Sequence, residues 1–199
     1  MYPDDSEATK CYLSRMKGRI CSLDGFTLVE LVVALAVAAI LLTIAIPSFQ
    51  TLIQSNRMAA NVNEFIAALN LARSEAIKRG VAVTLCKDGG SASACNNAAN
   101  WEAGWIVFSD LNGDGVVDAG DEVLRVYPAL DSGYTFNGNN NVTNRVTYNR
   151  RGMGTNGTLV MCDDRGFGEH ARAIGIARTG RAQAEHATEA DPPVESCQI

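Results

Sequence analysis

The chain has 199 residues, of which 47% are hydrophobic and 20% are charged, and its formal net charge at pH 7 is -5. This length leaves room for one globular domain once a leader and a long helix are set aside. The acidic balance argues against a nucleic-acid-binding surface that covers the protein, although a local basic patch remains open.

An uncharged apolar segment runs from Leu31 to Ile46. Together with the residues just before it, this segment reaches about 20 residues, the length of a helix that spans a bilayer. Its apolar residues cover every helical face, which is typical of a membrane span. The cations that precede it are Lys10, Arg15, Lys17 and Arg19. The positive-inside rule therefore predicts a cytoplasmic N-terminus, a single membrane span and an exported C-terminal domain.

Glu30 is anomalous, because a carboxylate within such a segment costs about 2.5–3.5 kcal/mol on membrane insertion and needs a functional reason. It ends the sequence Gly-Phe-Thr-Leu-Val-Glu, residues 25–30. This motif and the helix behind it resemble the processing site of type IV prepilins and type II secretion pseudopilins. The resemblance implies that a prepilin peptidase removes residues 1–25 by cutting after Gly25, and that Phe26 becomes a methylated N-terminus.

A cleaved secretory signal is the alternative, but no Ala-x-Ala-like site follows the apolar segment. We therefore expect residues 26–49 to remain as the transmembrane half of a long helix. The leader is unusually long, and Met16 offers a second candidate start of translation that would give a short, basic leader.

Beyond Pro47, which we expect to kink the helix, apolar residues recur at spacings of three and four. They are Met58, Val62, Phe65, Ile66, Leu69, Ala72, Ala76 and Ile77. Residues 50–80 are thus predicted to be an amphipathic helical half that belongs to the head. Lys78 and Arg79 in the last turn and Gly80 after it indicate where the helix ends.

Residues 81–199 change to short runs rich in β-branched and aromatic residues, separated by Gly, Asn and Asp. The predicted antiparallel strands are Val81–Leu85, Trp105–Phe108, Val123–Tyr127, Tyr134–Phe136, Arg145–Tyr148, Thr158–Met161 and Ala173–Ala177. Their apolar face requires a cover, which the amphipathic half of the helix supplies. The predicted fold is α+β, a lollipop whose long N-terminal helix packs on an antiparallel sheet.

Three segments narrow the resemblance to a family. They are Leu71–Gly80 (Leu-Ala-Arg-Ser-Glu-Ala-Ile-Lys-Arg-Gly), Gly104–Phe108 (Gly-Trp-Ile-Val-Phe) and Gly180-Arg181. With the helix-to-strand order, they are similar to the GspH/FimT family of minor pilins and pseudopilins, including the FimU type. The resemblance implies assembly with other major and minor pilins or pseudopilins, in which Glu30 pairs with the N-terminal amine of a neighbouring subunit.

The resemblance leaves three functions open. The first is a minor pilin that helps to prime or cap a type IV pilus, and the second is the H-type minor pseudopilin of a type II secretion system. The third is DNA capture for transformation, which some FimT-type members perform with a Gly-Arg-x-Arg pattern. Here Gln183 replaces the second Arg, and Glu185 and Glu189 follow. Arg172, Arg178 and Arg181 remain candidate DNA contacts, but we rank DNA binding third among the three functions and do not expect DNA to be a partner.

The cysteines support export. Cys11 and Cys21 lie in the leader, and the head retains Cys86, Cys95, Cys162 and Cys197. An even number of cysteines in an oxidising compartment indicates disulfides, and four cysteines allow three connectivities. The short intervening loop favours Cys86–Cys95, which leaves Cys162 for Cys197. A zinc site is the weaker alternative, because there is no Cys-x-x-Cys and both histidines, His170 and His186, lie in polar loops.

The segment Asp110–Asp121 has the oxygen spacing of an EF-hand-like calcium loop. Its ligand positions are Asp110, Asn112, Asp114, the carbonyl of Val116, Asp118 and Asp121, with Gly115 at position 6. The segment departs from an EF-hand in two ways: position 12 is Asp rather than Glu, and the flanking segments are predicted to be strands rather than helices. A polar hairpin connection without metal is the alternative. We expect calcium, if bound, to be structural, and we expect neither a required cofactor nor catalysis, because the sequence has no Ser-His-Asp order or phosphate-binding loop.

Overall fold

The structure is a computed structural model that describes residues 26–190 and 194–198. The chain divides into two compact units, one ending at Ser48 and the other formed by Phe49–Ile199. Helix α2 covers Leu28–Arg79, so its first part belongs to the first unit and its second part to the head. Side chains of residues 28–43 are exposed within this chain, and a helix that is apolar on every face requires a cover from outside the chain, such as a membrane.

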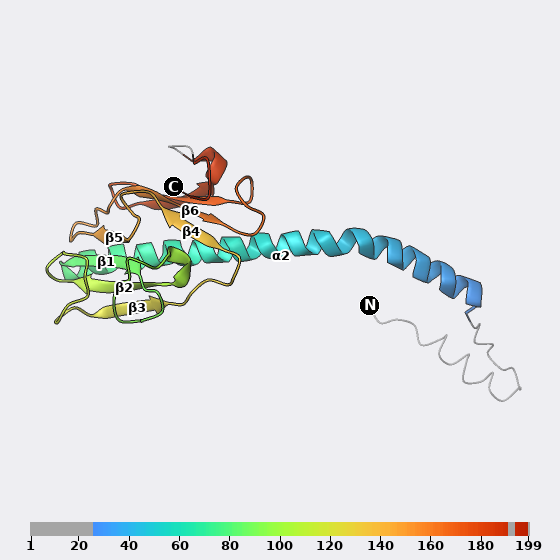
Figure 1. Cartoon of the computed structure of the whole chain (residues 1–199), viewed down its shortest axis with the longest axis horizontal. Helices are drawn as coiled ribbons and strands as arrows, with labels where there is room; N and C mark the ends of the chain where they lie inside the picture. Colours follow the sequence, from blue (N-terminus) through green and yellow to red (C-terminus); the bar gives the residue numbers. More distant parts are fainter. Residues whose placement is uncertain (1–25, 191–193, 199) are drawn as a thin grey trace, which may run out of the picture. The chain divides into compact units, whose positions relative to one another are not determined.

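The head contains two antiparallel four-stranded sheets (Figure 1). Sheet A has the order β3-β2-β1-β5, with β1 at Ala82–Lys87, β2 at Trp105–Asp110, β3 at Val123–Tyr127 and β5 at Arg145–Tyr148. Sheet B has the order β4-β6-β7-β8, with β4 at Thr135–Gly138, β6 at Gly157–Cys162, β7 at Arg172–Ile176 and β8 at Ala182–His186. Short 3-10 helices lie at Trp101–Ala103 and Ala187–Glu189.

The main core lies between the helix and the two sheets. The helix buries residues at spacings of three and four: Met58, Val62, Phe65, Ala68, Leu69, Ala72 and Ala76. Phe65 is at the centre, with its ring edge-on to Phe136 at 4.7 Å, Trp105 at 5.1 Å and Trp101 at 5.5 Å between ring centroids. Such edge-to-face pairs add stability beyond the apolar area that they bury.

The two faces of sheet B differ. Leu159 and Met161 of β6 and Ile174 of β7 face the main core. Residues on the opposite face, including Val160 and Ala173, pack under the C-terminal tail through Ala190, Val194 and Cys197. This alternation follows from the period of two in a β-strand. The tail therefore covers one end of the outer face of sheet B.

Two disulfides join the cysteines of the head, Cys86 to Cys95 and Cys162 to Cys197, which is the pairing favoured by the sequence. The first closes the loop between β1 and η2 beside Ile106 and Phe108. The second fastens the tail to β6, where Asn137 Nδ2 also donates a hydrogen bond of 2.8 Å to the carbonyl of Cys197.

The predicted fold class is confirmed: a long N-terminal helix packs on antiparallel sheets. Gly80 ends the helix in the left-handed conformation, with φ of 71° and its N–H 3.0 Å from the carbonyl of Ala76. Two expectations were wrong. Ile77, expected on the buried face, is 53% exposed at the helix end, and strand β8 was not foreseen, because its sequence Ala-Gln-Ala-Glu-His lacks β-branched residues.

Candidate functional site

The N-terminal motif occupies the start of α2. Gly25, the residue just before the expected cut, lies outside the described residues. Thr27 Oγ1 accepts a hydrogen bond of 3.2 Å from the backbone N–H of Glu30, which satisfies one of the free donors at the helix start. Within residues 26–190 and 194–198, the Glu30 carboxylate has no hydrogen bond or ion pair of its own.

The residues after Glu30 form a helix that is long and apolar enough to cross a membrane, by length and composition. None of the side chains in its apolar stretch is buried within the protein. A free carboxylate at the edge of such a stretch is expensive in hydrocarbon unless an opposite charge compensates it. The geometry therefore leaves Glu30 available for a cation from outside this subunit.

The end of α2 holds both sheets. Arg73 Nε donates to the carbonyl of Gly152 at 3.0 Å, in the β5–β6 connection, and Arg73 Nη2 donates to the carbonyl of Thr179 at 2.9 Å, in the β7–β8 turn. One guanidinium therefore ties the helix to a turn of each sheet. Its planar fork of donors suits two carbonyls at once, which a lysine ammonium cannot reproduce.

Charge pairs complete the last turn of the helix. Glu75 accepts hydrogen bonds from Arg79 Nε at 2.6 Å and Lys78 Nζ at 3.3 Å, and Arg79 also pairs with Glu122 just before β3. The hydrogen bond from Arg79, ahead of that from Lys78, lowers the pKa of the Glu75 carboxyl. Lys78 and Glu122 are exposed, whereas the Glu75 side chain is only 15% exposed, so the pairs chiefly orient the helix end.

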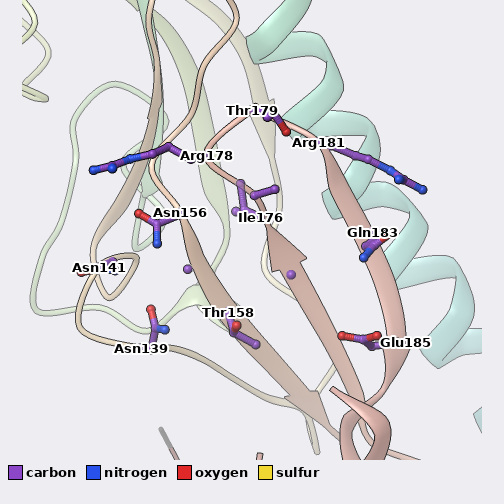
Figure 2. A pocket seen from close by; sticks show the side chains of 13 residues that line it. Asn139, Asn141, Asn156, Thr158, Ile176, Arg178, Thr179, Arg181, Gln183 and Glu185 are labelled. Carbon is purple, nitrogen blue, oxygen red and sulfur yellow. The ribbon is translucent and has the colours of Figure 1, made fainter. Parts of the chain in front are cut away.

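A groove of about 560 Å³ opens on the outer face of sheet B, at the end that the tail leaves uncovered (Figure 2). Its floor crosses three strands, because Thr158 of β6 pairs with Gly175 of β7, which pairs with Gln183 of β8. Gly175 makes the floor hollow, since a Cβ there would meet no heavy atom within 4 Å. The rest of the lining includes the polar residues Asn139, Asn141, Asn156, Arg178, Arg181 and Glu185 and the apolar residues Ile176 and Ala177.

Two of the three candidate DNA contacts, Arg178 and Arg181, line this groove. Figure 2 shows that they extend in opposite directions, Arg178 on the side of Asn156 and Arg181 on the side of β8. The third candidate, Arg172, is not beside them and instead donates to His186 Nδ1 at 2.9 Å and to the carbonyl of Glu169 at 2.8 Å. The structure therefore does not gather the three arginines into one patch.

Two arginines that the sequence motifs did not indicate lie next to the β7–β8 turn. Arg150 and Arg151 lie in the β5–β6 connection, and Gly152 of that connection contacts Gly180 of the β7–β8 turn. The contact joins residues 28 positions apart, and no local pattern in the sequence predicts it. In the sequence, only the pair Gly180-Arg181 indicated that this turn is of interest.

The acidic loop Asp110–Asp121 is held by its own hydrogen bonds. Asp110 is fully buried and accepts from Gly113 N at 2.7 Å, Thr84 Oγ1 at 2.8 Å and Gly115 N at 3.0 Å. Asn112 Nδ2 donates to Asp114 at 2.9 Å and to Asp118 at 3.0 Å, so an amide donor lies between these carboxylates. No group of three or more His, Cys, Asp or Glu residues in the described part of the chain converges as metal ligands would. In this arrangement the loop residues fit the hairpin interpretation better than a calcium cage.

Two family models match the chain. A prokaryotic N-terminal methylation motif matches residues 24–46, and the model of type II transport protein GspH matches residues 61–180. The second match covers more than half of the chain. The protein belongs to the GspH family.

A solved minor pilin shares this fold. The GspH-family chain is similar to the type IV minor pilin FimU of Pseudomonas aeruginosa, with 24% identity over 71% of this chain and 96% of that chain and a TM-score of 0.54. It is also similar to the minor pseudopilin EpsH of the type 2 secretion system of Vibrio cholerae, with 12% identity over 67% and 99% of the two chains and a TM-score of 0.47. No curated protein matches the chain significantly in sequence.

The residues that indicated the family have structural roles in this GspH-family chain. Arg73 and Glu75 anchor the helix end, as described above, and Trp105 lies in the core, stacked on Tyr127 at 5.5 Å between ring centroids. Gly104 has φ of 106° and lies against the backbone of Tyr127 and Pro128, where a side chain does not fit. Strand β8 and the disulfide-bonded tail lie beyond the matched residues 61–180.

Proposed function

We propose that this protein is a minor pilin that assembles into a type IV pilus and helps to prime or cap it. The observation that carries the proposal is the presence, in one chain, of an N-terminal methylation motif and a GspH head. Helix α2 contains most of the residues matched by the methylation motif and also the first residues matched by the GspH model. One continuous helix therefore joins the apolar anchor to the head. Pilins and pseudopilins act by assembling with one another, and we propose no catalytic role.

Glu30 carries the assembly step in this proposal. Its carboxylate has no partner among the described residues of its own chain, and the apolar residues beside it require compensation in a membrane. The N-terminal ammonium of Phe26 in a neighbouring mature subunit is a cation of suitable size and sign. Pairing compensates part of the cost of both charges, and a subunit in the wrong register leaves each charge unpaired, so the pair favours one register.

Maturation and location follow from the same motif. We propose that a prepilin peptidase cuts between Gly25 and Phe26 and that Phe26 is methylated. Before assembly, the protein spans the inner membrane once, with residues 1–25 cytoplasmic and the head periplasmic. Both disulfides of the head agree with an oxidising compartment.

A type II secretion system is the alternative machine. The family model that matches the head is that of a type II transport protein, and the same assembly physics applies to a pseudopilus. Deletion of the gene separates the two functions. A minor pilin is required for surface pili and leaves type II export unchanged, whereas a pseudopilin is required for export and leaves pili unchanged.

The assembly mechanism is tested with Gly25→Ala and Glu30→Gln. We expect Gly25→Ala to retain the leader, because the peptidase requires a residue without a side chain at the cut, and Glu30→Gln to be cleaved but excluded from filaments. Glu64→Gln, an exposed acid on the head part of the helix, is the matched control and is expected to behave as wild type. Intact-mass analysis of membranes and of sheared filaments measures both steps. A mature N-terminus other than Phe26, or normal incorporation of Glu30→Gln, contradicts the proposal.

A further inference from the structure

The groove of sheet B has features that the assembly function does not use. The side chains of its two arginines, Arg178 and Arg181, make no ion pair or hydrogen bond with the residues that the structure describes. An exposed guanidinium at each rim therefore remains available for an anionic group, which it binds with charge-assisted hydrogen bonds.

Two acceptors of the groove lining have no hydrogen-bond donor in the described part of the chain, Asn139 Oδ1 and the Glu185 carboxylate. Asn139 Oδ1 is covered in the free protein, so a ligand donor reaches it only when the amide turns toward the groove. Buried acceptors of this kind normally have a partner. Glu185 lies half-buried on the same lining and also accepts hydrogen bonds only. A suitable ligand thus brings hydroxyl or N–H donors as well as a negative charge.

These requirements exclude simpler ligands. Phosphodiesters offer no donors to Asn139 or Glu185, and the lining contains no aromatic side chain on which a base could stack. A protein partner usually anchors an aromatic or aliphatic side chain in an apolar pocket, whereas this floor is Thr158, Gly175 and Gln183. Amide side chains instead offer donors and acceptors in pairs, the pattern that neighbouring sugar hydroxyls match.

We propose that this groove binds an acidic saccharide. Hydroxyl groups lie on the amides of Asn139, Asn156 and Gln183 and on Glu185, and the carboxylate of the sugar contacts an arginine at the rim. The volume of about 560 Å³ is within the range of small-molecule sites and suits a few sugar rings. This binding is independent of the assembly function, because it uses neither Glu30 nor the helix end.

Isothermal titration of the mature, full-length chain tests the proposal, in a detergent without a sugar headgroup. The probes are tri-galacturonate and its fully methyl-esterified form, which has the same rings without the charge. We expect saturable binding of the acid and at least about tenfold weaker binding of the ester, since one charge-assisted contact is lost. We expect Arg178→Gln combined with Arg181→Gln to abolish this preference.

Gly175→Val is the decisive variant. Its φ is not in the left-handed region and its Cβ meets open space, so valine fits a β-strand there and fills the floor of the groove. We expect it to lose saccharide binding with an unchanged unfolding midpoint and normal entry into filaments. Thr135→Val, at an exposed strand position outside the lining, is the matched control and is expected to bind as wild type.

Several outcomes overturn the proposal while leaving the assembly function intact. They are no saturable binding of tri-galacturonate at millimolar concentration, equal affinity for acid and ester, and undiminished binding by Gly175→Val. Binding of duplex DNA that Gly175→Val abolishes, without binding of the saccharide, identifies a nucleic-acid site instead.

Discussion

Gly180 in the β7–β8 turn lies directly against the carbonyl oxygen of Gly152 in the β5–β6 connection, so closely that a Cβ on Gly180 would collide with it. Gly180 also has φ of 80°, a left-handed conformation that side chains disfavour. The fold therefore requires glycine at position 180, whether or not Arg181 binds a ligand.

Gly180→Ala is expected to destabilise the head by more than about 3 kcal/mol, because conformational strain and a backbone collision add together. Gly166→Ala is the matched control: its φ is 79°, and its Cβ meets nothing within 4 Å, so about 1–2 kcal/mol is expected from strain alone. Urea unfolding followed by tryptophan fluorescence measures both, because Trp101 and Trp105 are buried in the head. Equal costs for the two variants would refute the collision.

Arg73→Lys is expected to lower the free energy of unfolding by about 1.5–3 kcal/mol, although the charge is retained. Lysine cannot bond to the carbonyls of Gly152 and Thr179 at once, and a charged donor contributes that much. Arg57→Lys is the control, since its pair with Asp131 is exposed on both sides and is expected to change stability by less than about 0.5 kcal/mol. The same urea titration compares them, and a cost for Arg73→Lys no larger than the control would contradict the role of the fork.

The two disulfides are expected to contribute differently to the free energy of unfolding. Cys162 and Cys197 are 35 positions apart and Cys86 and Cys95 are 9 apart, so the former bond restricts the unfolded chain more. Replacement of Cys162 and Cys197 by Ala is expected to cost about 2–4 kcal/mol, and the same change at Cys86 and Cys95 less. Non-reducing peptide mapping checks the pairing, and any Cys86–Cys162 peptide would show that it is wrong.

Tyr148 gives the head a pH dependence above pH 10. Burial raises the pKa of its phenol to about 12, only partly offset by Arg73, and its hydroxyl oxygen has no partner in the described part of the chain. Below the unfolded pKa of about 10 the phenol is neutral in both states, so stability is unaffected. Between about pH 10 and 12 only the unfolded state ionises, and stability falls by about 2–3 kcal/mol. Tyr148→Phe is expected to be at least as stable at pH 7 and to lack this loss; urea midpoints at pH 8 and pH 11 measure it, and an equal loss in both proteins would contradict the assignment.

Calcium binding by the loop Asp110–Asp121 stays a prediction, and the structure adds a second one. Asp110→Ala is expected to destabilise the head by about 2 kcal/mol or more in EDTA, because it leaves the N–H groups of Gly113 and Gly115 without their acceptor. Asp118→Ala, at an exposed loop position, is expected to be nearly neutral in EDTA. If calcium binds, millimolar calcium raises the melting temperature of wild type and not of Asp118→Ala; no rise in either returns the loop to a plain hairpin connection.

The sequence predicted the helix, most strands and both disulfides for local reasons. Met58, Val62 and Phe65 repeat at helical spacing, and Gly80 marks the end of α2. Strand β8 could not be predicted, because Ala182–His186 has no strand-forming residues and takes its conformation from pairing with β7. The groove was equally hidden, since its floor depends on the register that places Gly175 between Thr158 and Gln183.

The end of α2 also determines how the head carries mechanical load. Arg73 joins the helix to a turn of each sheet, and Arg79 joins it to Glu122 at the entrance to β3. A pull along the helix axis in a filament therefore stretches several bonds in parallel, in shear across the core. Peeling, which breaks bonds one at a time, would require the sheets to separate from the helix first. In the proposed filament, tension along α2 would therefore load both sheets together rather than one before the other.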